Sequence, residues 1–538
     1  MFFISFEVNY KDVLGRIGII KTKSGDLETP HIFPVVNPTL QIISPKEIYE
    51  DHRCKAIMTN AYLVMKRLKE KAIRGGIHKA IGFDGIVATD SGAYQMLVYG
   101  KVEVLPDEIV KFEESIGSDI GIILDVPTGY EVSKERAEYT VKETLKNADI
   151  ALKTIKRKDI IWVGPIQGGV FTELLALSAK EMDKRPFSMY ALGSPTQVME
   201  QYMFDRLVEM IMTVKMNISI EKPLHLFGAG HPFVFPLTVA LGCDTFDSAA
   251  YALFARAGRY LTQSGTFKLE ELKYFPCSCP VCSKYTPKEV YGFEKDLKEK
   301  LLAKHNLCVS LEEIKRVKQA ILDGRLWELI EQRARAHPSL LQALLKLRKY
   351  EKIFKKYGPS VKNKGIFYFG REGLVRPEIV RAKDSILKNY KKPRGKKVLV
   401  LLPQTNTRPY HEDPHIKRMI DKLGKRNKLH LCMYAIPYGA VPIEIDDVYP
   451  FSQTETASPP DFETVQSSIE QTIKYIKRNK YEVTVALIKK DSLGSSLEKS
   501  LKRLEKESNV KLIIPYKGLE VFKSKVFKKL EKVIAKYS

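Results

Sequence analysis

The chain has 538 residues, of which 44% are hydrophobic, and this length is sufficient for roughly two to four globular domains. Lys and Arg outnumber Asp and Glu by 88 to 64, so the net charge of +24 favours a polyanionic partner such as nucleic acid, although a lysine-rich, heat-resistant proteome would give the same excess. The chain contains neither a run of about 18 apolar residues nor a basic leader with an apolar core, so we expect no membrane span and no signal peptide.

Eight short apolar runs alternate with helix-like stretches between residues 31 and 250. The runs occupy residues 31–36, 55–59, 85–89, 121–124, 160–163, 188–192, 224–227 and 245–246. Apolar strands that alternate with helices indicate a buried parallel sheet, and eight such units fit an α/β fold of the (β/α)8 TIM barrel type. An open, doubly wound sheet is the alternative, but no GxGxxG motif follows an early strand.

Acids, amides and glycines follow these runs. In chain order they are Asn37, Asn60, Asp90, Asp125, Gln167, Gly193, Gly228 and Asp247. A barrel gathers its catalytic groups where the strands end, and three acids and a glutamine in one ring therefore predict an active site there. A single acid after a strand is commonly only a helix N-cap. Asp244 precedes the last run, so we expect it at the start of that strand in a structural role.

A cysteine cluster interrupts the strand–helix rhythm after residue 270. Cys277, Cys279 and Cys282 are followed by His305, and three thiolates with one imidazole complete a tetrahedral zinc shell. Because protein ligands would fill all four positions, we expect one structural Zn²⁺ per subunit. The odd total of seven cysteines also indicates a reducing cytoplasm rather than a disulfide framework. A chance cluster is the alternative, and a lone helical histidine is often only a surface residue.

The remaining chain suggests further domains. We expect a catalytic barrel at 1–270, a zinc-binding and helical subdomain that completes it at 271–350, a basic and irregular connecting region at 351–395, and a smaller α/β C-terminal domain at 396–538. Strand-like runs in the last domain occupy residues 398–402, 430–434, 483–487 and 511–514. The chain then ends in a lysine-rich amphipathic helix that includes Val526, Leu530 and Val533.

The segment after the third run suits a purine. Gly92 permits close backbone approach, and Tyr94 offers a flat face for stacking. Asp125 and Gln167 provide acceptors and donors that match the edge of guanine. Each of these residues alone has a structural explanation as a cap, a core aromatic or a turn amide.

These motifs resemble those of the tRNA-guanine transglycosylases. Asp90–Gln95 resembles the DSG-x-[FY]-Q motif, Ile166–Gly169 the QGG turn, Phe246–Ala249 the FD-[SC] nucleophile motif, and the cysteine pattern the zinc site. Leu226–Pro232, Arg333–Pro338 and Arg376–Glu378 resemble the archaeal branch, and the likeness covers about residues 10–390. Ala93 departs from the more usual Gly or Ser, and residues 396–538 contain no recognisable PUA domain, the β-rich module with which the archaeal branch grips tRNA.

The resemblance implies a pentosyltransferase that replaces guanine 15 of the tRNA D-arm with preQ0 (7-cyano-7-deazaguanine) in archaeosine biosynthesis. Asp247 would be the nucleophile that forms a covalent ribosyl ester, and Asp90 the general acid and base, as in retaining glycoside hydrolysis. The implied substrate-binding residues are Asp125, Gln167, Gly193, Tyr94 and Ser91.

The resemblance also implies partners. They are tRNA, guanine, preQ0 and a second copy of the chain in a cytoplasmic homodimer, with no membrane, and a separate PUA-domain protein is a further candidate. An archaeosine synthase-like paralog, a non-catalytic zinc-bearing tRNA-binding scaffold and a queuine-type enzyme acting at the anticodon are the alternatives. The intact Asp90, Gln167 and Asp247 argue against the first two, and the archaeal motifs with the long basic C-terminal region argue against the third.

Overall fold

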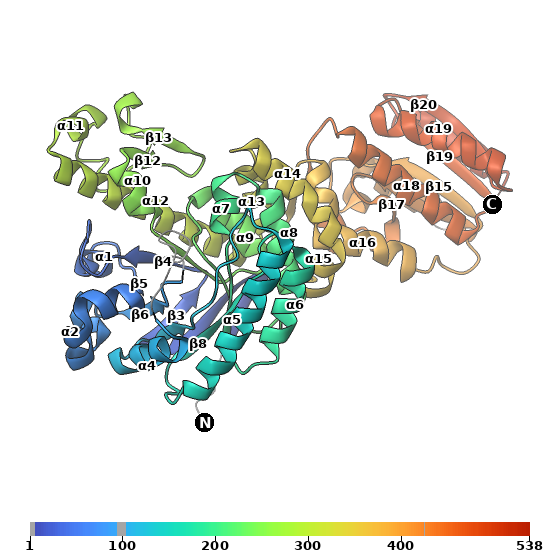
Figure 1. The fold of residues 1–538 in the computed structure, drawn as a ribbon. Helices are drawn as coiled ribbons and strands as arrows, with labels where there is room; N and C mark the ends of the chain where they lie inside the picture. The colour runs from blue at the N-terminus through green and yellow to red at the C-terminus, as the bar shows by residue number, and fades with distance from the viewer. Residues whose placement is uncertain (1–5, 94–103, 424–425, 538) are drawn as a thin grey trace. The chain divides into compact units, whose positions relative to one another are not determined.

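A computed structural model describes residues 6–93, 104–423 and 426–537 (Figure 1). The chain divides into two compact units, Met1–Tyr350 and Glu351–Ser538. In the described residues, none of the helices has both the length and the apolar character that a membrane crossing requires.

The first unit is built around a closed barrel of eight parallel strands. The strands are β4 (His31–Val36), β5 (Ala56–Asn60), β6 (Ile86–Asp90), β7 (Ile120–Ile122), β8 (Ile161–Ile166), β9 (Met189–Leu192), β10 (Leu224–Leu226) and β11 (Thr245–Ser248). They follow one another around the barrel in chain order, and β11 pairs with β4 to close it. All eight predicted strands are present, and the TIM barrel prediction is confirmed.

Helices separate the strands along the chain (Figure 1). They are α1 (Pro45–Glu50), α2 (Ala61–Ile81), α4 (Pro106–Ile116), α5 (Lys134–Thr154), α6 (Thr172–Asp183), α7 (Thr196–Glu200), α8 (Phe204–Lys215), α9 (Phe235–Ala240) and α10 (Ala250–Arg256). Helix α5 shows why they form. The Ser133 side chain caps its N-terminus by accepting from the Arg136 backbone, and its buried positions recur every three or four residues, including Ala137, Val141 and Ala148.

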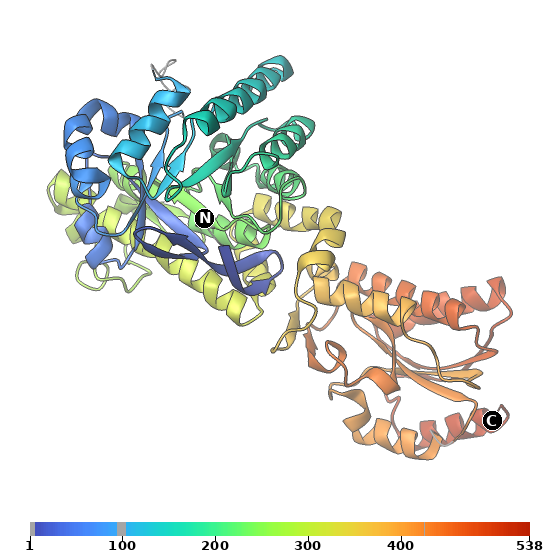
Figure 2. The same cartoon turned by 90° about the horizontal axis from the view of Figure 1, so that it is seen from below.

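A three-stranded antiparallel sheet closes the N-terminal end of the barrel. It consists of β1 (Phe6–Asp12), β2 (Gly15–Thr22) and β3 (Gly25–Thr29), coloured dark blue in Figure 2. Ile20 of β2 and Leu27 of β3 are buried in the same apolar cluster as the barrel residues Phe33, Ala56 and Ile86. The barrel interior is therefore a packed core, and the sequence did not predict this closing sheet.

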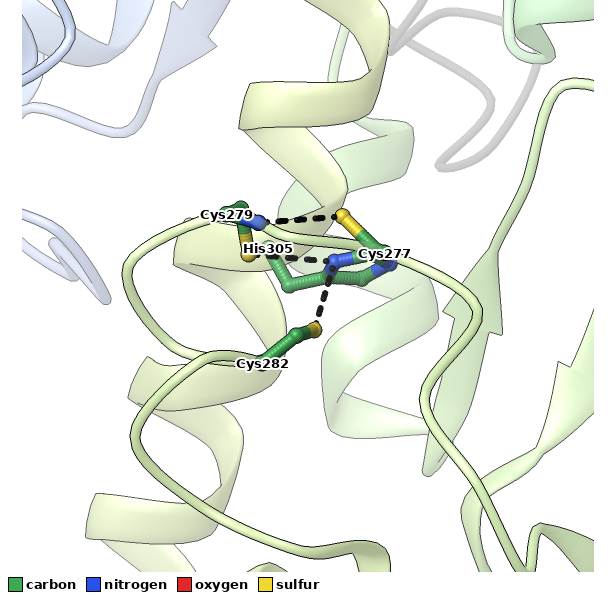
Figure 3. Close-up of side chains that lie close together, drawn as sticks. All are labelled: Cys277, Cys279, Cys282 and His305. Atoms are coloured by element: carbon green, nitrogen blue, oxygen red, sulfur yellow. Dashed lines mark hydrogen bonds between the residues drawn. The ribbon is translucent and has the colours of Figure 1, made fainter.

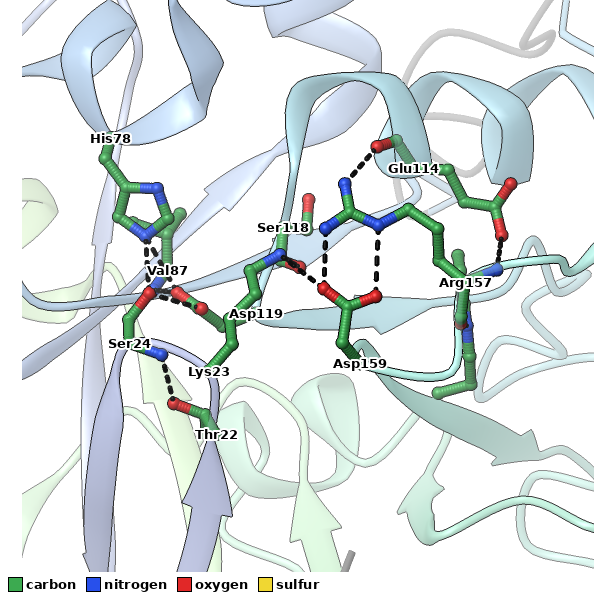
Figure 4. A network of polar contacts seen from close by, with 11 residues as sticks. Thr22, Lys23, Ser24, His78, Val87, Glu114, Ser118, Asp119, Arg157 and Asp159 are labelled. Carbon is green, nitrogen blue, oxygen red and sulfur yellow. Dashed lines mark hydrogen bonds and ion pairs between the residues drawn. The ribbon is translucent and has the colours of Figure 1, made fainter. Parts of the chain in front are cut away.

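Polar contacts fix this sheet to the barrel (Figure 4). The buried Asp119 carboxylate accepts from Ser24 Oγ at 2.6 Å and from the Val87 amide at 2.8 Å, and it contacts His78 Nε2 at 2.8 Å. Lys23 Nζ donates to the Ser118 carbonyl at 2.6 Å. The turn between β2 and β3 is thus anchored beside the start of β7.

A second acid performs the same task at the start of β11. Arg16 on β2 donates from Nε and Nη2 to the two Asp244 oxygens at 2.7 Å each, and the Leu224 amide donates to the same carboxylate at 2.9 Å. Both side chains of the pair are almost completely buried. Bidentate pairing satisfies a buried carboxylate, so Asp244 is structural, as its position before the strand predicted.

The chain leaves the barrel into a hairpin and further helices. These elements are β12 (Arg259–Leu261), β13 (Thr266–Lys268), α11 (Pro287–Gly292), α12 (Lys295–Leu322), α13 (Leu326–Ala334) and α14 (Pro338–Lys346). The long helix α12 packs against α10 and β12. It therefore connects the region after residue 270 to the segment that follows the last barrel strand.

The second unit contains a five-stranded α/β sheet of order β17-β16-β15-β19-β20. Its strands are β15 (Val398–Pro403), β16 (Leu429–Ala435), β17 (Gly439–Pro442), β19 (Val483–Lys489) and β20 (Lys511–Gly518), and its helices are α17 (Pro414–Leu423), α18 (Phe462–Asn479), α19 (Ser492–Glu507) and α20 (Ser524–Ile534). All four predicted strands are present, and the strand of this sheet that the sequence did not predict is the short antiparallel β17. Helix α20 buries Val526 and Leu530 while its lysines stay exposed.

Residues 351–395 are more regular than expected. They contain α15 (Glu351–Tyr357), β14 (Ile366–Tyr368), which pairs with β18 (Thr454–Thr456), and α16 (Pro377–Lys388). Helix α16 buries Ile379, Ala382 and Ile386 on one face. The basic side chains between these positions conceal the helical period in the sequence.

Candidate active site and metal centre

The predicted polar residues converge where the barrel strands end. Asp90 is the last residue of β6, Asp247 lies in β11, and Gln167 and Gly193 directly follow β8 and β9. Together with Asp125 in the loop after β7, they line a single cavity of about 980 Å³. The sequence therefore placed these five residues in one site at the C-terminal face of the barrel.

The environment of Asp90 strongly favours its neutral form. Burial, followed by the nearby carboxylates of Asp125 and Asp247, raises its pKa to about 7. The backbone amides of Ser91 and Gly92 act in the opposite direction. A carboxyl group with this pKa exists in both protonation states near neutral pH, so Asp90 can donate a proton and accept one.

Asp125 and Gln167 form a buried hydrogen-bonded pair. Gln167 Nε2 donates to Asp125 Oδ2 at 2.5 Å, while Gln167 Oε1 accepts from the Thr128 amide, the Thr128 hydroxyl and the Ser194 hydroxyl at 3.0–3.1 Å. These three donors identify the amide oxygen and turn its nitrogen toward Asp125. Burial raises the pKa of Asp125 to about 6. At higher pH the carboxylate is an acceptor for N–H groups.

Gly193 contributes space rather than a functional group. A Cβ atom at this position would lie 2.2 Å from Gln167 Nε2 and 2.5 Å from Gln167 Cδ. Any other residue would displace the amide that holds Asp125. The glycine is therefore needed for the geometry of the Asp125–Gln167 pair.

The Asp247 carboxylate is held through one of its two oxygens. Oδ1 accepts from the Gly228 amide at 2.8 Å and contacts His225 Nε2 at 3.1 Å. Gly228 has a φ of +62°, and a Cβ there would lie 2.4 Å from Thr196 Oγ1, so this close approach needs glycine. In the described part of the chain, Oδ2 makes no hydrogen bond, and the side chain is 14% exposed.

Two further predicted site residues have different outcomes. Ser91 is fully buried beside Asp90, and its Oγ has no hydrogen-bond partner within the described residues. Tyr94 lies outside the described residues. Sequence reasoning missed Thr128 and Ser194, which orient Gln167, and the aromatic ring of Phe227, which lines the cavity. Phe227 falls within the Leu226–Pro232 motif, but no local signal marks the other two.

The four predicted metal ligands lie together (Figure 3). One ligand atom from each of Cys277, Cys279, Cys282 and His305 falls within 4.8 Å of the others. His305 Nδ1 lies 3.5 Å from Cys279 Sγ and 3.4 Å from Cys282 Sγ. The cysteines come from the loop after β13 and the histidine from α12, so the cluster joins two segments of the first unit.

The orientation of the His305 ring suits a metal. Its Nε2 donates to the Leu261 carbonyl at 2.8 Å, so in the neutral ring Nδ1 carries the free lone pair and is directed at the sulfurs. Tyr260 stacks on the ring with centroids 3.7 Å apart. Three thiols and an imidazole with this arrangement can hold a metal ion.

Known proteins with similar sequences indicate the family to which this chain belongs. Residues 12–339 match the family model described as queuine tRNA-ribosyltransferase. A tRNA-guanine(15) transglycosylase of Methanocaldococcus jannaschii is 46% identical over 86% of this chain and 70% of its own length. One of Methanosarcina mazei is 41% identical over 88% of this chain and 92% of its own length.

The chain belongs to the tRNA-guanine transglycosylase family. Membership identifies it as a pentosyltransferase and confirms the resemblance seen in the motifs. Residues 379–533, in the second unit, match a separate model described as a domain of unknown function, DUF5591. The transglycosylase match thus covers the barrel and the metal cluster.

Proposed function

We propose that this chain replaces guanine at position 15 of tRNA with preQ0, as a step of archaeosine biosynthesis. One observation carries the proposal. Asp90, Asp125, Gln167 and Asp247 surround one cavity in a chain that is 41–46% identical to tRNA-guanine(15) transglycosylases. The four side chains provide a nucleophile, a proton carrier and a base-edge reader.

In the first half of the proposed reaction, Asp247 Oδ2 attacks C1′ of nucleotide 15. The C1′–N9 bond breaks, its electron pair leaves with guanine, and Asp90 supplies the proton that the departing base takes up. The product is a ribosyl ester of Asp247, and the phosphate backbone stays intact. The position of Oδ2, which has no hydrogen bond in the described residues, supports this assignment.

In the second half, the incoming base replaces guanine in the same pocket. Asp90, now ionised, takes the N9 proton of the base, and N9 attacks C1′ and displaces the Asp247 carboxylate. Two displacements at one carbon retain its configuration. Water must be excluded meanwhile, because hydrolysis of the ester would leave an abasic site.

The Asp125–Gln167 pair provides recognition of the base. The ionised Asp125 accepts from the N1–H and the exocyclic amine, which guanine and preQ0 share. Gln167 keeps Asp125 in place and has a second N–H to offer the base. Gly193 leaves room for that amide, and Ser91 and Tyr94 complete the proposed pocket.

Replacing Gly193 with alanine is expected to weaken guanine binding by about tenfold or more, because the new methyl group displaces Gln167 and frees Asp125. Isothermal titration with guanine measures the affinity. Gly292→Ala is the matched control, because a Cβ atom there would meet nothing within 4 Å. Native affinity in Gly193→Ala would rule out this arrangement of the base pocket.

We also propose that the four-residue cluster holds one structural Zn²⁺. Thiolate and imidazole ligands suit zinc, and Cys277, Cys279, Cys282 and His305 fill a tetrahedral shell without an open position. A zinc ion there joins the cysteine loop to α12. The proposed base exchange uses no metal-bound group.

Elemental analysis of the purified chain is expected to find about one zinc per subunit. Cys282→Ser should abolish this stoichiometry and lower the melting temperature, because the metal no longer links the loop to α12. Cys54→Ser is the matched control, since Cys54 lies outside the cluster and its Sγ donates to the Ala56 carbonyl at 3.2 Å, a bond that serine can keep. Retention of zinc by Cys282→Ser, or its loss from Cys54→Ser, would refute the ligand set.

The proposed partners follow from this reaction. The substrate is tRNA, which the net charge of +24 favours, together with guanine and preQ0. A homodimer in the cytoplasm and an auxiliary PUA-domain protein complete the proposal. Adding such a protein to the exchange assay tests whether it raises the affinity for tRNA.

Incorporation of radiolabelled guanine into a tRNA transcript tests the proposed function. We expect label at position 15 with a transcript that carries G15, and none with a transcript in which A15 replaces it. Binding of tRNA without incorporation would favour the non-catalytic scaffold. Incorporation at the anticodon would favour the queuine-type alternative, and either result would overturn the proposal.

A further inference from the structure

We propose that His225 and Thr245 act as a positioning pair that holds the Asp247 carboxylate in its reactive orientation. The inference rests on the proposed role of Asp247 as nucleophile. It adds two residues to the machinery, neither of which lies on the surface of the cavity. They act through Asp247 and do not touch the reacting atoms.

Strand pairing brings the three residues together. His225 on β10 is the register partner of Thr245 on β11, and Asp247 lies two residues farther along the same strand. Residues two apart on a strand point to the same face, so both Thr245 and Asp247 can reach the histidine ring. The distances are 2.9 Å from His225 Nδ1 to Thr245 Oγ1 and 3.1 Å from His225 Nε2 to Asp247 Oδ1.

The chemistry of the partners determines which ring nitrogen carries the proton. An ionised carboxylate only accepts hydrogen bonds, so Nε2 must be the donor to Asp247. In the neutral imidazole Nδ1 is then an acceptor, and the Thr245 hydroxyl donates to it. The Asp247 carboxylate thus sets the tautomer of His225, and the Thr245 hydroxyl anchors the other side of the ring through Nδ1.

Packing fixes the ring itself. His225 is 1% exposed, and Phe33 and Phe227 flank it with ring centroids 6.1 Å and 4.9 Å away. A side chain enclosed in this way keeps its donor in one place. Preorganised donors of this kind need no rearrangement at the moment of reaction.

The consequence concerns the two oxygens of Asp247. The Gly228 amide and His225 both contact Oδ1, which leaves Oδ2 toward the cavity. Without His225, one backbone donor alone would hold the carboxylate, and the group could rotate away from the attack direction. The loss should therefore appear in the chemical step rather than in tRNA binding.

Steady-state kinetics of base exchange separate these effects. His225→Leu is expected to lower kcat by about 10- to 100-fold and to leave KM for tRNA within about threefold of native, because one hydrogen bond to a charged group is lost. His225→Gln, whose amide can donate to Oδ1, should recover most of this loss. The inference would be overturned if His225→Leu kept the native kcat, or if its KM for tRNA rose by as much as its kcat fell. It would also be overturned if His225→Gln did not recover the lost kcat.

A spectroscopic readout is independent of activity. In the full-length chain labelled with ¹⁵N-histidine, the His225 signal, assigned through its loss in His225→Gln, should show hydrogen on Nε2. Thr245→Val should keep the hydrogen on Nε2 but shift the ¹⁵N resonance of Nδ1, because its side chain cannot donate to Nδ1. An Nδ1–H ring in the native chain would overturn the pairing even if exchange occurs. The expected spectrum in a chain without exchange activity would support the pairing while refuting the proposed function.

Discussion

Replacing Asp247 with asparagine is expected to lower the rate of guanine exchange by about 10⁴-fold or more, because a neutral amide cannot form the ribosyl ester. The substitution keeps the shape of the side chain. In the native chain, the Gly228 amide and His225 contact Oδ1 of Asp247. The amide oxygen of asparagine can accept from the same two groups. Folding and tRNA affinity should therefore stay near native values, and a single-turnover assay with labelled guanine should reveal the loss.

Asp84→Asn is the matched control for this experiment. Asp84 is exposed in the turn before β6, away from the cavity, and its replacement changes the net charge by the same amount. Exchange by Asp247→Asn within tenfold of the native rate would remove Asp247 as the nucleophile. If Asp247→Asn and Asp84→Asn both lost tRNA affinity, that loss would result from the change in charge alone.

Replacing Asp90 with asparagine is expected to slow formation of the covalent intermediate by about 10²- to 10⁴-fold, because the departing guanine then receives no proton from the enzyme. The physical basis is the position of the Asp90 pKa. Burial and the carboxylates of Asp125 and Asp247 raise it to about 7, whereas an ordinary aspartate is almost fully ionised at neutral pH.

The direction of the pH dependence follows from this value. The first half-reaction needs protonated Asp90, so its rate should fall as the pH rises through about 7. The second half needs ionised Asp90, so attack by the incoming base should slow as the pH falls through the same value. Rapid-quench measurement of each half-reaction from pH 5 to 9 tests both slopes. The Asp90→Asn variant should lose both slopes around pH 7 and keep only the decline below about pH 6 that protonation of Asp125 causes.

The opposite slopes make this prediction specific to Asp90. A first half-reaction that accelerates above pH 7, or one whose pH dependence is unchanged in Asp90→Asn, would assign the proton to a different group. Asp84→Asn serves again as the control and should reproduce both native slopes. The contrast between these variants separates proton transfer from a general effect of charge.

The barrel could be predicted because its strands are buried on both sides and read as continuous apolar runs. The ends of those runs located Asp90, Gln167, Gly193 and Asp247, since parallel strands expose their C-terminal ends on one face. The predicted start of β11 also distinguished the two acids of this segment. Asp244 precedes the strand and pairs with Arg16, whereas Asp247 lies near its C-terminal end. The cysteine ligands could be predicted because all three lie within one short loop.

Other features have no local signature. The hydroxyls that orient Gln167 come from Thr128 and Ser194, which lie in two separate loops and are brought to it by the fold. Strands β1 and β3 are mostly exposed and form no continuous apolar run, and the short apolar run of β2 lies before the repeating strand–helix pattern begins. The partnership of His225 with Asp247 depends on the register of β10 and β11, which the sequence does not display.

In the proposed reaction, Asp247 carries the ribosyl group of nucleotide 15 during base exchange. Capture of this covalent intermediate is the decisive experiment. The full chain is mixed with tRNA, denatured within one turnover, digested with protease and nuclease, and sequenced by mass spectrometry. We expect free guanine and a peptide esterified at Asp247 to C1′ of nucleotide 15, with no adduct in Asp247→Asn. Release of guanine without an adduct, or an adduct on another residue or nucleotide, would contradict it.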